Sequence, residues 1–198
     1  MPQDASTEPA PSRGRGRPRS ADRDADIRAA AWQLIAQSGC AGLTFEAIAQ
    51  QIGCSRSTLY RRFDAKGDLI SHLLDQTALD YAPQFAVDAP PREQLIAHAL
   101  TCAEMYEGSR GAALVQIIGA SRTDETIARA VTAHSQMVEP HYYEPMAILA
   151  PDATDRSIKL ALHGLIGSIL HHVATRRDRL TPSEIQRLVD AAIALARS

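Results

Sequence analysis

The chain has 198 residues, of which 45% are hydrophobic and 5% aromatic, and its formal net charge at pH 7 is −2. A chain of this length can bury a sizeable core, and its hydrophobic content excludes a wholly disordered protein. The longest nearly uncharged apolar run, residues 160–170, is too short to span a bilayer, and no apolar signal segment opens the chain. The three cysteines have no paired spacing, which indicates neither a disulfide framework nor a zinc site. We therefore expect a soluble, cytoplasmic protein.

Two kinds of sequence precede the first expected helix. Residues 1–12 are polar, rich in proline and alanine and without periodicity, so we expect them to be disordered. Residues 13–19, RGRGRPR, alternate arginine with glycine and proline, and residues 15–18 resemble the core of an AT-hook. In such an arm the backbone stays thin while arginines enter the narrow minor groove of A·T-rich DNA. We predict that Arg15, Arg17 and Arg19 bind DNA, with a solubilising tail as the alternative.

A first helix is expected from about residue 22 to residue 38. Ile27, Ala31, Leu34 and Ile35 give it one apolar face, and glycines at positions 39 and 42 end it. Trp32 lies off that stripe, and we expect it to mark the join to a second domain.

Residues 44–66 predict a short helix, a tight turn and a second short helix. Thr44 is placed to cap the first helix, Gly53 to end it and Ser55 to cap the second. The inward positions fit a steep helix crossing with a glycine in the turn: Phe45, Ile48, Ala49, Ile52, Leu59 and Phe63.

The outer face of the second short helix carries hydrogen-bond donors and positive charge but no acid. It is formed by Arg56, Ser57, Thr58, Tyr60, Arg61 and Arg62. Such a face suits the phosphates and base edges of DNA. The alternative is an ordinary helical hairpin with a basic, solvated face.

This stretch resembles the DNA-binding domain of the TetR family of bacterial transcriptional regulators. The matching residues are Thr44, Ile48, Ala49, Gly53, Ser55, Thr58, Leu59, Tyr60, Phe63, Lys66 and Leu69, and the match runs from about residue 27 to residue 74. The sequence departs from the family pattern at Cys54 (commonly valine), at Ala65 (usually serine or asparagine) and at Gly67 (usually acidic). We expect the change at Gly67 to weaken the cap of the helix that follows.

The resemblance implies a homodimeric regulator in which this motif reads a palindromic site, most often as a repressor. We assign base readout to Arg56, Ser57 and Arg61. Ser55 belongs to the same predicted DNA surface, and phosphate contacts are assigned to Thr44, Thr58, Tyr60, Arg62 and Lys66. The resemblance supplies the phosphate role of Tyr60 and Lys66. Lys66 stands near a helix start, where its charge opposes the helix dipole, and a phosphate contact explains that placement.

Downstream, apolar stripes at helical spacing and the lack of strand alternation predict an all-α fold of about nine helices. Helices are expected from residue 66 toward 81, around 95–105 and 114–118, from 127 to near Pro145, and over 158–173 and 185–196. We divide the chain into a tail with the basic arm (1–21), a three-helix helix-turn-helix DNA-binding domain (22–68), and a ligand-binding and dimerisation domain (69–198).

The last two helices are more apolar than one core-facing side requires, and Ala161, Gly164 and Ser168 would let another helix approach closely. We expect them to form a four-helix bundle with their copies, although burial within one subunit is the alternative. By resemblance the middle helices surround a pocket for a small-molecule effector. The candidates are Phe85, Met105, Tyr106, His134, Met137, Tyr142 and Tyr143, and ordinary core packing is the alternative for each.

No catalytic constellation stands out. His134 and His141 are two helical turns apart, about 10 Å, which is too far to ligate one metal from a straight helix. We expect no catalytic residue, no cofactor and no metal. Two other functions remain open: an effector-independent architectural protein that prefers A·T-rich DNA, and a helical small-molecule enzyme on the same fold.

Overall fold

The computed structural model describes residues 20–176 and 178–198. Within those residues the chain forms nine α-helices and no strand, which confirms the all-α prediction. The helices are α1 (Ser20–Gly42), α2 (Phe45–Gln51), α3 (Arg56–Tyr60), α4 (Lys66–Asp80), α5 (Pro91–Met105), α6 (Gly108–Ala120), α7 (Glu125–Leu149), α8 (Asp155–Thr175) and α9 (Pro182–Ala196). The predicted DNA contacts Arg15, Arg17 and Arg19 lie outside the described residues.

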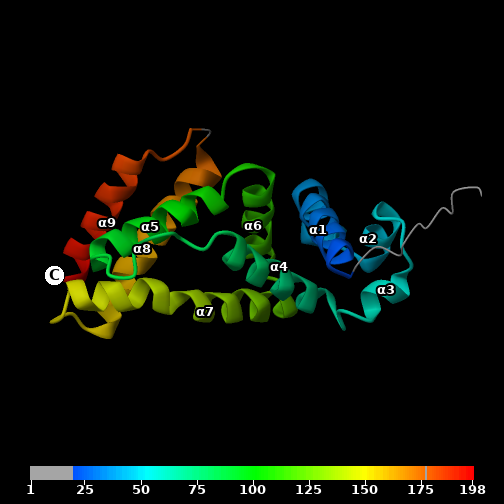
Figure 1. Cartoon of the computed structure of the whole chain (residues 1–198), viewed down its shortest axis with the longest axis horizontal. Coiled ribbons are helices and arrows are strands. Elements are labelled where there is room, and N and C mark those ends of the chain that lie inside the picture. The colour runs from blue at the N-terminus through cyan, green and yellow to red at the C-terminus, as the bar shows by residue number, and fades with distance from the viewer. Residues whose placement is uncertain (1–19, 177) are drawn as a thin grey trace, which may run out of the picture.

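Helices α1–α3 lie at one end of an elongated molecule, and α5, α8 and α9 lie at the other (Figure 1). Helix α7 runs along much of the length, with α4 and α6 between the two ends (Figure 1). In the part of the chain that the structure describes, no helix is long and apolar enough to cross a membrane.

The turn between α2 and α3 forms as the sequence predicts. The hydroxyl of Thr44 accepts a hydrogen bond from the Ala47 N–H at 3.0 Å and caps α2. Gly53 has φ 62°, a left-handed conformation that glycine adopts at little cost. The N–H of Cys54 donates a hydrogen bond to the carbonyl oxygen of Ala49 at 2.9 Å. Ser55 is the N-cap residue of α3, as predicted, but its side chain makes no capping bond. Its hydroxyl bonds instead to the hydroxyls of Ser57 at 2.8 Å and Thr58 at 3.0 Å.

Helix α1 begins two residues before the predicted start and extends beyond the predicted end at residue 38. A break occurs at Gly39, as expected, where φ 65° and ψ −176° are not helical, but helical turns continue to Gly42. The extension has a packing reason, because Cys40 and Leu43 are buried in the core.

The start of α4 lacks a side-chain cap, as expected, because Ala65 has no oxygen to accept from the first turn. Asp68, at the third helical position, accepts a hydrogen bond from the Ala65 N–H at 2.8 Å and so supplies one half of a capping box. Gly67 is buried, and a Cβ atom there would lie 3.2 Å from Cβ of Thr126, so its role is a close helix contact.

The predicted end of the long helix near Pro145 is also wrong. Helix α7 passes through Pro140 and Pro145 and ends at Leu149. Each proline removes one backbone hydrogen-bond donor from the helix. Met146, which follows Pro145, is nevertheless fully buried among residues of α5, α8 and α9. Packing of this last turn offsets the lost bonds, which a sequence pattern alone does not reveal.

Two clusters of buried residues form the core. The first joins α1–α4 to α6 and the beginning of α7, and the second joins α5 and the end of α7 to α8 and α9. Leu69, Ile70 and Leu73 of α4 belong to the first cluster, so apolar packing is continuous across residue 68. The predicted domain boundary at that residue stays a prediction.

Leu59 of α3 is fully buried in the first cluster, whereas Leu79 of α4 is 69% exposed. We predict that Leu59→Ala lowers the free energy of unfolding by about 2–5 kcal/mol because it leaves a cavity beneath a five-residue helix. Leu79→Ala is the matched control and should stay within about 0.5 kcal/mol of the wild type. Urea unfolding followed by circular dichroism measures both, and equal effects would contradict the packing described here.

Candidate DNA-binding surface

The predicted reading residues share the exposed side of α3, over a buried anchor. Arg56, Ser57, Tyr60, Arg61 and Arg62 are exposed and Thr58 is half-buried, while Leu59 fixes the helix to the core. Helix α3 lies at the end of the molecule remote from α9 (Figure 1). Its outer side chains are therefore free to meet a large partner.

Hydroxyl groups line the beginning of this surface. The capping hydroxyl of Thr44 accepts one bond, and its own hydrogen remains able to donate to a phosphate. Ser55, Ser57 and Thr58 hold one another through short hydroxyl–hydroxyl contacts. Mutual bonding fixes these side chains before any partner arrives, which reduces the entropy lost on binding.

Tyr60 is exposed, but packing restrains its side chain. Its ring packs edge-to-face against Phe45 of α2, with centroids 5.0 Å apart, and Phe45 in turn lies 6.5 Å from Phe63. Edge-to-face packing restrains the tyrosine ring, so the exposed residue keeps a defined position next to α3.

Three of the predicted cations are paired with acids that sequence reasoning missed. Arg56 lies 3.0 Å from the Glu46 carboxylate of α2, and Lys66 lies 3.1 Å from the Asp124 carboxylate. Arg62 pairs with Asp24 of α1. None of these partners is adjacent in sequence, and nothing in the pattern of Glu46, Asp24 or Asp124 distinguishes them from solvated surface acids.

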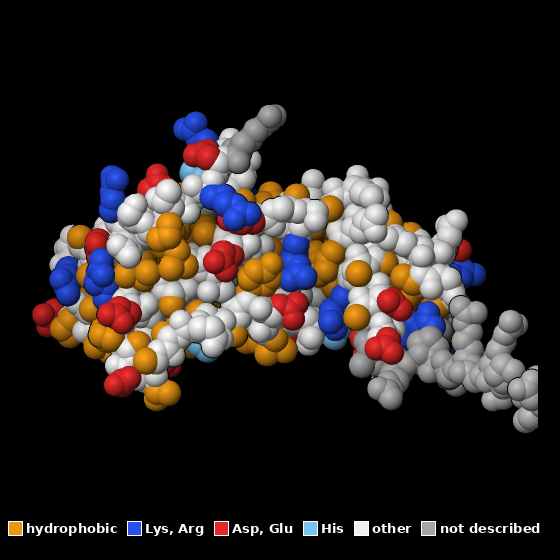
Figure 2. Space-filling view, turned by 45° about the horizontal axis from the view of Figure 1, so that its top comes forward, with side chains coloured by type: hydrophobic (Ala, Val, Ile, Leu, Met, Phe, Trp, Pro, Cys, Tyr) orange, Lys and Arg blue, Asp and Glu red, His pale blue; other side chains and the backbone are white. Residues whose placement is uncertain are grey.

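The pairing leaves a surface of mixed charge. Figure 2 shows basic and acidic side chains interspersed along the face that it presents. DNA binding here must rely on the local cations of α3 and its neighbours, because the net charge of the chain is −2.

Comparison with known proteins decides the family. A sequence model of the family described as "Bacterial regulatory proteins, tetR family" matches residues 27–73, which span the core of α1 through most of α4. The chain carries the DNA-binding domain of the TetR family. It is a DNA-binding transcriptional regulator of the helix-turn-helix type.

Relatives match this chain along most of its length. The uncharacterized HTH-type transcriptional regulator YdeS of Bacillus subtilis (strain 168) is 22% identical over 186 residues, 88% of this chain and 90% of the relative. A putative transcriptional regulator from Pseudomonas aeruginosa PAO1 has a similar structure, with a TM-score of 0.71 and 18% identity, covering 91% of each chain. A putative regulator from Saccharomonospora viridis, solved in complex with choline, has a TM-score of 0.61 and 16% identity, covering 88% of this chain and 97% of the other. These structures share the fold.

The seven predicted ligand residues do not all converge on one place, although Phe85 and Tyr142 both lie against the His98 ring. Phe85, between α4 and α5, packs against His98 with ring centroids 5.5 Å apart, and the Tyr142 hydroxyl donates to the His98 carbonyl at 3.1 Å. Of the remaining five, Met105 packs against the first cluster, Tyr143 packs against the second, and Tyr106 packs against both. The Met137 side chain is exposed. His134 is half-buried, and its buried Nδ1 atom has no hydrogen-bond partner in the described chain. Their ligand role stays a prediction.

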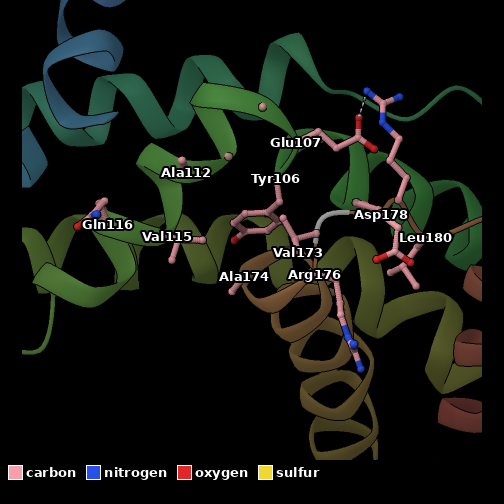
Figure 3. Close-up of a pocket in the computed structure, with 14 residues that line it drawn as sticks. Tyr106, Glu107, Ala112, Val115, Gln116, Val173, Ala174, Arg176, Asp178 and Leu180 are labelled. Atoms are coloured by element: carbon pink, nitrogen blue, oxygen red, sulfur yellow. Dashed lines mark ion pairs between the residues drawn. The ribbon is translucent and has the colours of Figure 1, made fainter. Parts of the chain in front are cut away.

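A cavity of about 410 Å³ lies between the end of α5, α6 and the end of α8. Tyr106 is the only one of the seven predicted residues among its described lining residues. Its ring lies between Val115 of α6 and Val173 of α8, and an ion pair of 2.8 Å joins Glu107 to Arg179 at one edge (Figure 3). Burial raises the pKa of Tyr106, so its hydroxyl stays protonated and can donate a hydrogen bond at neutral pH.

The α6 and α8 residues of this cavity were missed by sequence reasoning. The sequence pattern predicts ordinary core positions for Val115 and Val173. Only the packing of α5, α6 and α8 shows that these two side chains border a cavity. Within the described residues, no group of three or more histidine, cysteine or acidic side chains could hold a metal ion.

His98 of α5 gives a pH-dependent prediction. Its ring stacks on His141 of α7 at 5.6 Å, and burial together with the charge of His141 lowers the pKa of His98 to about 4. The unfolded chain takes up this proton near pH 6.5, so between about pH 6.5 and 4 it binds more protons than the folded chain. We predict that the free energy of unfolding falls as the pH decreases through this range.

His98→Gln should remove part of that decrease, as measured by urea unfolding at several pH values. Titration of the His98 ring by NMR provides the direct check. A midpoint near 6.5 in the folded chain would contradict the burial of this ring.

Proposed function

We propose that this regulator is a ligand-responsive repressor that binds a palindromic operator as a homodimer. The observation that carries the DNA-reading part is the exposed, donor-rich side of α3 above the buried Leu59. Base readout falls to Arg56, Ser57 and Arg61. We assign phosphate contacts to Thr44, Thr58, Tyr60, Arg62 and Lys66, with Ser55 on the same surface. The arm carrying Arg15, Arg17 and Arg19 adds affinity in the minor groove.

The ion pair of Arg56 with Glu46 does not prevent base readout by Arg56. An exposed pair is worth only about 0.2–1 kcal/mol, and both side chains of the Arg56–Glu46 pair are more than half exposed. A phosphate or guanine edge offers a charge-assisted contact, and phosphate contacts also release counterions from the DNA. Arg56 can therefore exchange its acid for DNA at small cost.

The homodimer is supported by the outer face of α8 and α9. Leu160 and Leu195 are large apolar residues that are 58% and 42% exposed, and small residues at positions 164, 167 and 168 line a groove of about 510 Å³ on α8. Small residues allow close approach of a second helix, so two copies of this face suit a four-helix bundle. A twofold dimer would set its two α3 helices on successive major grooves of a palindrome.

The effector is proposed to occupy the cavity between α5, α6 and α8. Its volume of about 410 Å³ fits a small molecule, and the related S. viridis structure contains choline, which supports a small-molecule ligand for this fold. An effector that prefers a dimer with wrongly spaced α3 helices would release the operator by its differential affinity for the two states. A regulator of this kind works beside the bacterial chromosome, in the cytoplasm.

Selection of bound sequences from a random duplex pool at stated, near-physiological salt tests the proposal. An inverted repeat with fixed half-site spacing is the expected result. Enrichment of A·T-rich sequence without symmetry would instead favour the effector-independent architectural protein.

Arg56→Ala should weaken operator binding by about 1–3 kcal/mol and relax the preference at one base pair in each half-site. The physical reason is the loss of a guanidinium that donates two bonds to a base edge. Fluorescence anisotropy with the selected operator and single-base variants measures both effects. Equal weakening on every sequence would make Arg56 a phosphate contact.

Gly164→Arg should disrupt the dimer, because a long charged side chain on the close-approach surface of α8 cannot be buried without a partner. Sedimentation velocity should show a monomer, and binding to the palindrome should lose its cooperativity. Thr132→Arg, at an exposed position of α7, is the control and should leave the sedimentation coefficient unchanged. A dimeric Gly164→Arg variant would exclude this face as the interface.

A further inference from the structure

The cavity between α5, α6 and α8 has small, apolar walls beside Tyr106. The side chains that form these walls carry no charge and no hydrogen-bonding atom. They are Ala103 of α5, Ala112 and Val115 of α6, and Val173 and Ala174 of α8. Figure 3 shows the Tyr106 ring among them, between Val115 and Val173. The part of a ligand that lies beside this ring therefore contacts hydrocarbon from three helices.

The turn between α5 and α6 fixes the backbone of Tyr106. Tyr106 caps the end of α5, and its N–H donates a hydrogen bond to the Cys102 carbonyl oxygen at 3.3 Å. Gly108, where α6 begins, has φ 64°, so the chain turns back in a conformation that glycine adopts at little cost. Gly111 is buried, and a Cβ atom there would collide with the Tyr106 carbonyl oxygen. The first turn of α6 thus packs directly on the backbone that carries the tyrosine ring.

The Tyr106 hydroxyl is a hydrogen-bond donor for a ligand. Burial, with a smaller effect of Cys102, raises the pKa of Tyr106, and no hydrogen bond to the hydroxyl from another described residue contributes to this shift. The group is therefore protonated at neutral pH. Because an un-ionised phenol has one O–H to donate, a ligand acceptor in the cavity gives it a partner.

The charged residues of the cavity lie at its solvent edge. Glu107 and Arg179 form an ion pair of 2.8 Å, so each already has a counter-ion, and the Arg179 side chain is 80% exposed. Three further polar lining residues are exposed: Gln116, Arg176 and Asp178. In Figure 3 the Arg176 side chain extends away from the Tyr106 ring. A charged ligand group beside that ring would be buried with no unpaired counter-ion next to it among the described lining residues, which is strongly unfavourable.

We propose that this cavity binds a compact, uncharged, largely apolar molecule with one hydrogen-bond acceptor, a carbonyl or ether oxygen, that meets the Tyr106 hydroxyl. The volume of about 410 Å³ lies near the lower end of the range of ligand pockets, about 300–1,000 Å³, which requires a compact molecule. The apolar walls supply affinity, and the single donor selects for the acceptor. The inference rests on the effector role proposed for the cavity.

Four probes of similar size separate charge from hydrogen bonding. Acetophenone is uncharged and has a carbonyl acceptor, whereas ethylbenzene is uncharged and has none. Benzoate is an anion, and benzyltrimethylammonium is a cation. Titrations of the full chain, followed by saturation-transfer NMR of each probe, give the four dissociation constants.

Acetophenone should bind about threefold to tenfold tighter than ethylbenzene, because its carbonyl oxygen accepts from Tyr106. Benzoate and benzyltrimethylammonium should bind at least about tenfold more weakly than acetophenone. Tyr106→Phe keeps the ring and should remove the preference for acetophenone over ethylbenzene. The comparison of the four probes on the wild type tests the proposal even if this variant does not fold.

Val115→Trp locates the bound probe, because an indole at this position fills the cavity and should abolish acetophenone binding. Val87→Trp is the matched control, since Val87 is fully exposed and does not line the cavity, and it should leave binding unchanged. Thermal unfolding checks that each variant is folded.

The proposal is overturned if either charged probe binds as tightly as acetophenone, if acetophenone and ethylbenzene bind equally, or if no probe binds. Binding that persists in folded Val115→Trp also overturns it, because the ligand would then lie elsewhere. Operator release is measured separately, by fluorescence anisotropy of the selected operator with each probe. A probe that binds in the cavity without changing operator affinity contradicts the effector role but leaves the ligand class intact.

Discussion

The reading helix depends on a core that it does not supply itself. Helices α2 and α3 have seven and five residues, and helices of this length are unstable in water without tertiary packing. Ile48 and Leu59, one from each, are fully buried in the cluster completed by α4, α6 and the start of α7. The orientation of the DNA-reading surface is therefore a property of the whole first cluster, and any movement of α4 or α6 must reach it.

Electrostatics organises the same region in a second way. Each of Arg56, Arg62 and Lys66 meets an acid from a different helix, respectively α2, α1 and the cap of α7. The pairs differ in exposure: the Arg56–Glu46 pair is open to solvent, whereas the Lys66–Asp124 pair is largely covered. Water screens the first pair strongly and the second much less, so the first can exchange its acid for DNA while the second holds its geometry. The Arg62–Asp24 pair is as covered as the Lys66–Asp124 pair, so the three cations differ in how readily water reaches their acid partners.

Local signals in the sequence were sufficient for much of the fold and for the reading surface. The stripe through Ile48, the cap at Thr44 and the left-handed turn at Gly53 each follow from neighbouring residues, and all three are confirmed. The failures concern tertiary context. The passage of α7 through Pro145 depends on burial of Met146, and the cavity walls depend on how α5, α6 and α8 meet. The acid partners of the cations escaped detection for the same reason, since each pair joins residues that are distant in the chain.

Helix α6 connects the proposed effector cavity to the reading end, because its two sides have different neighbours. Gly111, Ala112, Val115 and Gln116 border the cavity, while Arg110 lies over the rings of Trp32 in α1 and Tyr81 at the end of α4, at 5.9 and 5.4 Å. The same guanidinium lies 3.4 Å from the Asp80 carboxylate of α4. Trp32, predicted from sequence to mark the join to a second domain, is thus half-buried at the contact between α1 and α6. A ligand that displaced α6 would have to move Arg110 between these rings or break its contacts. Because Asp80 and Tyr81 close α4, such a displacement would act directly on the end of this helix, and the beginning of the same helix follows α3 in the chain.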